Sequence, residues 1–181
     1  MFGEVGYVIG QILSIVAVIL GFISYQMKTS QKILAIEIIT ALVFSAHYLL
    51  IGAPTAMALN LLGAVQCVVF YFRDKQGKKG WILPVIFSVI TVATGIMTWD
   101  GWHSVLIMLG LVAYNLSIAS QNAQIIRYAM FFKSPMCLAY NAIAFSVGGI
   151  IYECSVLISS VIGTLRYHKN KKKEILGNGK I

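Results

Sequence analysis

The chain alternates between long apolar runs and short polar breaks, and the lengths of these runs give the first expectation. Six runs extend over roughly 18–22 residues, the length at which a helix crosses the hydrocarbon core of a bilayer. These runs are 6–27, 32–52, 54–73, 81–98, 102–119 and 148–167. A seventh run, 122–145, is interrupted by polar residues, among them Lys133, and by Pro135. The pattern predicts an all-α membrane protein with six clear spans and one uncertain span.

The basic residues decide whether 122–145 crosses the membrane. With seven spans and the N-terminus outside, the basic clusters at 28–32, 73–79 and 166–173 all face the cytoplasm. The outer segments then hold Glu4 and Asp100 and contain no lysine or arginine. This distribution follows the positive-inside rule, which would be broken if the seventh run did not span. We therefore expect seven transmembrane helices, with the N-terminus outside and the C-terminus in the cytoplasm.

Composition supports the membrane class and excludes several others. The chain is 59% hydrophobic and only 11% charged, whereas soluble domains carry about a quarter charged residues. The net charge of +8 is concentrated at the ends of the runs, so it indicates topology and no nucleic-acid partner is expected. The cysteines Cys67, Cys137 and Cys154 lie inside apolar runs without ligand-like spacing, and we interpret them as small buried hydrophobes. We expect no metal, no cofactor and no enzymatic activity, because the sequence lacks the common catalytic motifs.

The sequence also contains a weak internal repeat. "LGFISYQ" at 20–26 is similar to "LGLVAYN" at 109–115, a separation of 89 residues. "SQ" at 30–31 recurs at 120–121, a separation of 90 residues. Three spans in each copy, with the span at 81–98 as a connector, would make both copies run in the same direction. The expected division is 1–73 for the first three-helix bundle, 74–101 for the linker segment with the fourth helix, 102–168 for the second bundle and 169–181 for a basic cytoplasmic tail.

This layout of three, one and three helices resembles the SWEET and PQ-loop transporter superfamily. Within it, "GFISYQMKTSQ", "SAHYLLIGAPTAMALN" and "LISSVIGTLRYH" are similar to the YgjV-type bacterial inner-membrane proteins. The resemblance implies a multi-pass protein of the bacterial inner membrane, with polar residues of the third and seventh helices around a central pocket. Asn60 and Glu153 occupy the matching positions. The superfamily has a Pro-Gln pair near the end of its first helix, and here Tyr25-Gln26 and Tyr114-Asn115 lack the proline.

Charged residues within the spans are the candidates for a site. A lysine or a glutamate at mid-bilayer costs about 2.5–3.5 kcal/mol on insertion scales, so such residues should face protein or water. Pro135 frees a backbone carbonyl next to Lys133, which favours a cavity there. We expect a substrate site formed by Lys133, Asn60, Glu153, His47, Tyr140 and Asn141.

Two readings of these charges stay open. Glu153 lies about 12 Å from Lys133 along the bundle axis, so the two residues either form a direct pair or share a pocket. A direct pair would only fix packing, as buried ion pairs do elsewhere. A carboxylate and a histidine such as Glu153 and His47 would also suit proton coupling.

Glu37 and Arg127 occupy equivalent positions in the two copies, about one and a half turns from the inner ends of their helices. A two-fold axis along the membrane normal would bring them face to face. We expect the two residues to pair across this axis and to form an inner gate. The full set of predicted gate residues is Glu37, Arg127, Tyr25, Gln26, Tyr114 and Asn115.

The expected function is transport of a small polar solute, sugar-like or anionic, by alternating access between the two bundles. A receptor with the same fold, binding a ligand without net transport, is one alternative. A structural membrane protein whose charges only fix packing is another. The expected partners are the solute and membrane lipids, and the chain would act as a monomer or a homodimer.

Overall fold

The computed structural model describes residues 3–78 and 80–178, with side chains placed up to Lys172. These residues form seven α-helices, and each predicted span corresponds to one of them, so the all-α class is confirmed. The helices are α1 (Gly3–Gln26), α2 (Ser30–Ile51), α3 (Pro54–Lys75), α4 (Ile82–Met97), α5 (Ser104–Ile118), α6 (Ala123–Ile143) and α7 (Val147–Asn178). Residues 179–181 of the predicted tail lie outside the described part of the chain.

Local sequence explains where several helices begin and end. The Thr29 side chain accepts a hydrogen bond from the backbone N–H of Lys32 and caps the start of α2. Gly52 adopts a left-handed conformation, with φ of 79°, and donates to the last carbonyls of α2. Pro54 follows as the first residue of α3, where its missing N–H has no effect. Asn122 caps α6 in the same way as Thr29 caps α2.

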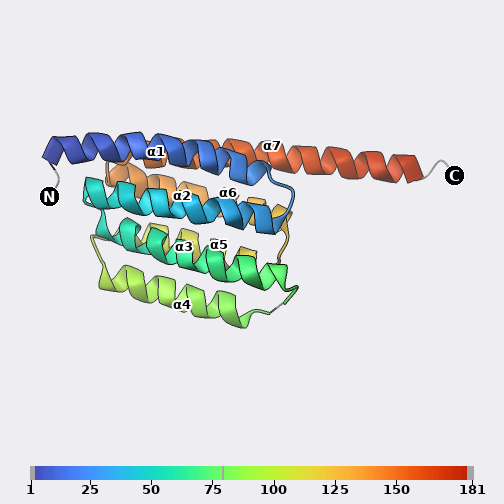
Figure 1. Ribbon diagram of the computed structural model, residues 1–181, viewed down its shortest axis with the longest axis horizontal. Helices are drawn as coiled ribbons and strands as arrows, with labels where there is room; N and C mark the ends of the chain where they lie inside the picture. Colours follow the sequence, from blue (N-terminus) through green and yellow to red (C-terminus); the bar gives the residue numbers. More distant parts are fainter. Residues whose placement is uncertain (1–2, 79, 179–181) are drawn as a thin grey trace.

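The helices form a flattened ring in the order of the chain. Each helix packs against the next, and α1 packs against α7 to close the ring. Figure 1 shows α1, α2, α3 and α4 in one layer, with α7, α6 and α5 in the layer behind. The loops after α1, α3 and α5 share one end, which carries Lys28 and Lys78 and is named the basic end below. The opposite end carries Glu4 and Asp100 and is named the acidic end.

The outer surface of the ring is apolar, as contact with lipid requires. The helices α1, α2 and α3, together with residues Val147–Lys172 of α7, are long and apolar enough to cross a membrane. The helices α4 and α5 are shorter but also apolar. Cys67 and Cys137 are buried as expected, whereas Cys154 is exposed on the outside of α7, so its predicted burial was wrong.

The parallel helices α1 and α7 approach closely because glycines lie at their contact. A Cβ atom on Gly21 would lie 2.2 Å from the ring of Tyr152, and one on Gly148 would lie 1.7 Å from the hydroxyl of Ser14. The absence of a side chain at Gly21 therefore leaves room for Tyr152 to turn into the interior of the ring.

The helix α7 extends further than the sequence analysis predicted. The predicted span ends at 167 and 169–181 was expected to be a separate basic tail, whereas α7 continues as one helix to Asn178. Figure 1 shows this part projecting beyond the other helices at the basic end. The sequence after residue 167 is too polar for a span, but lysine, glutamate and leucine are good helix formers, so the helix continues in water.

Candidate functional site

A cavity of about 70 Å³ lies in the centre of the ring and is lined by residues of every helix from α2 to α7. A water molecule needs roughly 10–15 Å³ of such volume, so the cavity holds a few waters. Binding sites for drug-sized molecules are larger, on the order of 300–1,000 Å³. The cavity in this structure is therefore too small for a drug-sized molecule.

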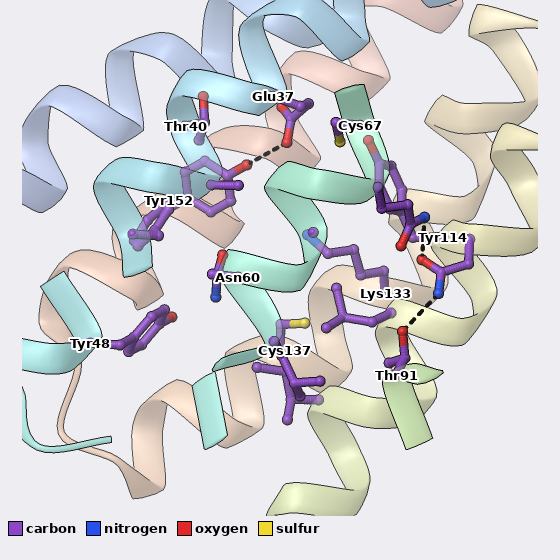
Figure 2. A pocket seen from close by; sticks show the side chains of 18 of the residues that line it. Glu37, Thr40, Tyr48, Asn60, Cys67, Thr91, Tyr114, Lys133, Cys137 and Tyr152 are labelled. Carbon is purple, nitrogen blue, oxygen red and sulfur yellow. Dashed lines mark hydrogen bonds between the residues drawn. The ribbon is translucent and has the colours of Figure 1, made fainter. Parts of the chain in front are cut away.

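Lys133 extends into this cavity from the middle of α6, as Figure 2 shows. It is 7% exposed, and it lies ten residues from each end of Ala123–Ile143, or about 15 Å at the helical rise. Its Nζ atom lies 5.7 Å from the ring centroid of Tyr114 and 5.8 Å from that of Tyr152. The lysine ammonium is thus held between two aromatic faces at mid-span.

Glu153 supplies the nearest acceptor for the lysine. The distance from Lys133 Nζ to Glu153 Oε1 is 3.5 Å, which makes a long ion pair. Glu153 is 4% exposed and lines the cavity together with Lys133. The two possibilities left open by the sequence thus hold together, since the residues pair directly and also share a pocket.

Glu37 is a second carboxylate in the same cavity. Its Oε2 atom accepts a hydrogen bond of 3.4 Å from the hydroxyl of Tyr152 (Figure 2). The other oxygen of Glu37 and the Oε2 atom of Glu153 are buried and have no hydrogen-bond partner among the described residues. The described lining thus contains two carboxylates and one ammonium group, with acceptor capacity left unused.

A polar chain forms the wall between α3, α4 and α5. The amide of Gln66 donates to Asn115 at 2.7 Å, and Asn115 donates to the hydroxyl of Thr91 at 3.0 Å. Asn60 lies on the same helix as Gln66 and donates back to the carbonyl of Ala56 at 2.8 Å. Both Asn60, which was predicted for the substrate site, and Asn115, which was predicted for the gate, line the cavity.

Gln66, Thr91 and Tyr152 also line the cavity and were not predicted from the sequence. A signal existed for Gln66, since an amide within an apolar span needs a partner as much as the asparagine at position 60 does. Threonine and tyrosine are common in transmembrane helices, so Thr91 and Tyr152 gave no signal from sequence alone.

His47 does not belong to the cavity, which corrects its predicted role. Its Nδ1 atom lies 2.8 Å from the carbonyl of Gly10, so this nitrogen donates. Its Nε2 atom then accepts from the hydroxyl of Ser146, also at 2.8 Å. Both ring nitrogens are satisfied and the residue is fully buried, so His47 ties α1, α2 and the loop before α7 together. The predicted combination of Glu153 with His47 for proton coupling has no support in this geometry.

Tyr140 and Asn141 also lie outside the described lining of the cavity, toward the acidic end. The hydroxyl of Tyr140 donates to Asp100 at 2.9 Å. Asn141 accepts a hydrogen bond of 2.6 Å from Tyr48, which itself lines the cavity. Tyr140 lies seven residues beyond Lys133 on α6, or about two helical turns, and so does not reach the cavity.

The predicted pair between Glu37 and Arg127 is not formed by the described residues. Arg127 instead donates to the carbonyl of Tyr25 at 2.9 Å, to Gln124 at 2.8 Å and to the carbonyl of Met27. The end of α1 leaves these carbonyls without partners inside the helix, and a cation is stabilised there. Equivalence in the repeat therefore did not predict the partners of Arg127.

The other predicted gate residues divide between the cavity and the contact of α1 with α7. Tyr114 lines the cavity, and its hydroxyl group has no partner among the described residues. The hydroxyl of Tyr25, on α1, is buried and unpartnered in the same way. Gln26 donates to the hydroxyl and the carbonyl of Ser159 on α7, at 2.8 and 2.9 Å.

A bundle of apolar helices that keeps its charges around an internal cavity defines a polytopic α-helical membrane protein. The chain belongs to the Imp-YgjV family of bacterial inner membrane proteins, whose sequence profile matches residues 8–171. It is similar to "Inner membrane protein YgjV" of Escherichia coli (strain K12), with 20% identity over 169 residues that cover 93% of this chain and 90% of that protein. No solved structure matches the chain. The expected location in the bacterial inner membrane is thus confirmed.

Proposed function

We propose that the protein transports a small polar solute through the central cavity. The observation that carries this proposal is the position of Lys133, Glu153 and Glu37 around one cavity at mid-span. Charged groups at this depth are costly and in membrane proteins they mark substrate or ion pathways. The cavity holds only a few waters here, so a larger solute enters only when the ring opens toward one side of the membrane.

The charges narrow the solute class that the sequence analysis expected. Two carboxylates against one ammonium group disfavour an anion, because its charge would add to the excess of negative charge in the cavity. A neutral solute, or one with an amino group, fits better. Such a group can use the free oxygens of Glu37 and Glu153, and it would contact the same aromatic rings as the lysine ammonium.

We further propose that α1–α3 and α5–α7 are two parallel repeats with α4 as linker, as in the SWEET and PQ-loop superfamily. The packing supports this equivalence, because the middle helix of each set, α2 or α6, packs against both others. On one side of the ring, α4 packs against both α3 and α5 and so joins the two sets. On the other side, α7 packs directly against α1. The positive-inside rule places the basic end in the cytoplasm, with the N-terminus outside.

The inner gate is proposed to be the contact of Arg127 and Gln26 with their partners on α1 and α7. Arg127 holds the end of α1 through two carbonyls, and Gln26 holds α7 through Ser159. Opening toward the basic end requires these bonds to break, while Glu37 stays at the cavity.

A thermal-shift screen of the purified protein in detergent tests the transport site. Sugars, amines, amino acids, nucleosides and carboxylates are tested with the wild type, Lys133→Met and the double variant Lys133→Met/Glu153→Gln. Lys32→Met, an exposed lysine on α2, is the matched control. We expect a neutral or amine solute to raise the melting temperature of the wild type and of the control only.

Uptake of the compound that binds into proteoliposomes then separates a transporter from a receptor, because a receptor binds without flux. If every class leaves the melting temperature unchanged, or if the shift persists in both site variants, the central site is wrong.

A purely structural role is the second candidate, and the ion pair of Lys133 with Glu153 favours it. Replacing a buried pair by uncharged residues is often neutral or stabilising. This role predicts that the double variant is at least as stable as the wild type and that no compound in the screen binds.

A further inference from the structure

A second recess lies at the basic end, between the end of α1, the start of α6 and the part of α7 that leaves the bundle. Its volume is about 430 Å³. Four cationic side chains line it, and none of its described lining residues is acidic. The cationic residues are Lys28, Arg127, Arg166 and Lys171. The recess shares no described lining residue with the central cavity, although Arg127 and Gln26 also belong to the proposed inner gate.

Arg127 makes this recess more than a group of solvated surface charges. The residue is 4% exposed, and the protein fixes its guanidinium group by bonds to Tyr25, Met27 and Gln124. A Cβ atom on Gly163 would lie 2.6 Å from Arg127 Nε, so the glycine makes room for the guanidinium group. Only three of its five N–H groups are used in these bonds, which leaves donors for a ligand.

The residues next to the recess indicate where its ligand comes from. One helical turn deeper in the bundle, Ile23 on α1 is 41% exposed and Ile162 on α7 is 38% exposed. The recess thus lies directly above an apolar outer surface. An anion that carries acyl chains fits both the cationic recess and this apolar surface, because its headgroup contacts the cations while its chains contact the isoleucines.

We propose that this recess binds the phosphate group of an anionic phospholipid. Arginine and lysine are the usual ligands of phosphate, and basic pockets between transmembrane helices on the cytoplasmic side bind lipid headgroups elsewhere. Arg166 and Lys171 would contact the phosphate from α7, and Lys28 would contact it from the loop after α1. The bound lipid would bridge α1 and α7, the two helices that close the ring.

Lipid binding to the intact protein, measured by native mass spectrometry from detergent, tests this proposal. The probes are phosphatidylglycerol, phosphatidylcholine and inorganic phosphate. The site variant is Arg166→Gln/Lys171→Gln. The matched control is Lys169→Gln/Lys172→Gln, which removes the same charge from exposed positions of α7 outside the described lining.

We expect the site variant to bind phosphatidylglycerol roughly thirtyfold more weakly, since each cation near an anionic surface contributes about fivefold. The control variant should lose much less affinity. If inorganic phosphate binds and the site variant loses affinity for it to the same extent, the recess is still a phosphate site, but its ligand is a soluble phosphate compound. An equal loss in both variants, or equal binding of phosphatidylcholine and phosphatidylglycerol by the wild type, would overturn the proposal. Circular dichroism checks that each variant is folded.

Discussion

The central cavity and the acidic end both bury polar residues, but the hydrogen bonding of these residues differs between the two regions. At the acidic end, both ring nitrogens of His47 have partners, and Tyr140 donates to Asp100. In the cavity, Glu37 and Glu153 each keep one buried oxygen without a partner in the described part of the chain. A satisfied polar network fixes packing, whereas an unsatisfied buried acceptor favours a ligand or water. The difference supports the proposal that Glu37 and Glu153 belong to a site and that His47 belongs to the scaffold.

The largest expected effect comes from removing the charge of the lysine. Lys133→Met leaves two buried carboxylates without their cation and should lower the free energy of unfolding by about 3–5 kcal/mol. Adding Glu153→Gln removes one of these carboxylates and should recover most of the loss. Denaturant unfolding in detergent measures both values. A single variant as stable as the wild type would show that the pair carries no stabilising interaction in solution.

A smaller loss of stability is expected from a substitution at the acidic end. His47→Ala removes two hydrogen bonds and leaves the carbonyl of Gly10 and the hydroxyl of Ser146 to find other partners. The free energy of unfolding should fall by about 2–3 kcal/mol, on the basis of one unsatisfied group and one lost bond. The temperature shift produced by a cavity ligand should stay unchanged. Loss of that shift in a folded variant would place His47 back in the site.

The smallest effects come from a matched pair of tyrosines, each of which donates to a carboxylate. Tyr140→Phe removes a 2.9 Å bond and should cost about 1.5–3 kcal/mol without changing ligand affinity. Tyr152→Phe removes a longer bond of 3.4 Å and should cost about 1 kcal/mol or less. The latter should nevertheless alter ligand affinity, because Tyr152 lines the cavity. Isothermal titration with the compound found in the screen compares the two, and the opposite order of effects on affinity would contradict the distinction between the regions.

The sequence predicted the number of helices, their type and most of their ends, because run length, caps and prolines act locally. It also predicted that Lys133, Asn60 and Glu153 face one interior. These three residues needed only the rule that a polar group in a span avoids lipid. The placement of Glu37 followed the same rule, but its partner was wrong.

The errors at Arg127, Glu37 and His47 concern the partners that these side chains meet. The carbonyls at the end of α1 bind Arg127 in place of Glu37, and these acceptors exist only once the helix has ended and packed. His47 likewise needed the carbonyl of Gly10 and the hydroxyl of Ser146, which lie 37 and 99 residues away in the chain. The hydrophobic pattern does not predict such side-chain contacts, because they depend on the orientation of each of the seven helices about its own axis.

The continuation of α7 beyond the bundle has a practical consequence. A 19.8 kDa chain surrounded by detergent offers electron microscopy little from which to determine particle orientation. Because α7 runs as one helix from Val147 to Asn178, a helical fusion partner joined in register at its end would take its orientation from the bundle. Such a rigid marker would let images of the fusion be aligned, and the open and closed forms of the cavity could then be compared directly.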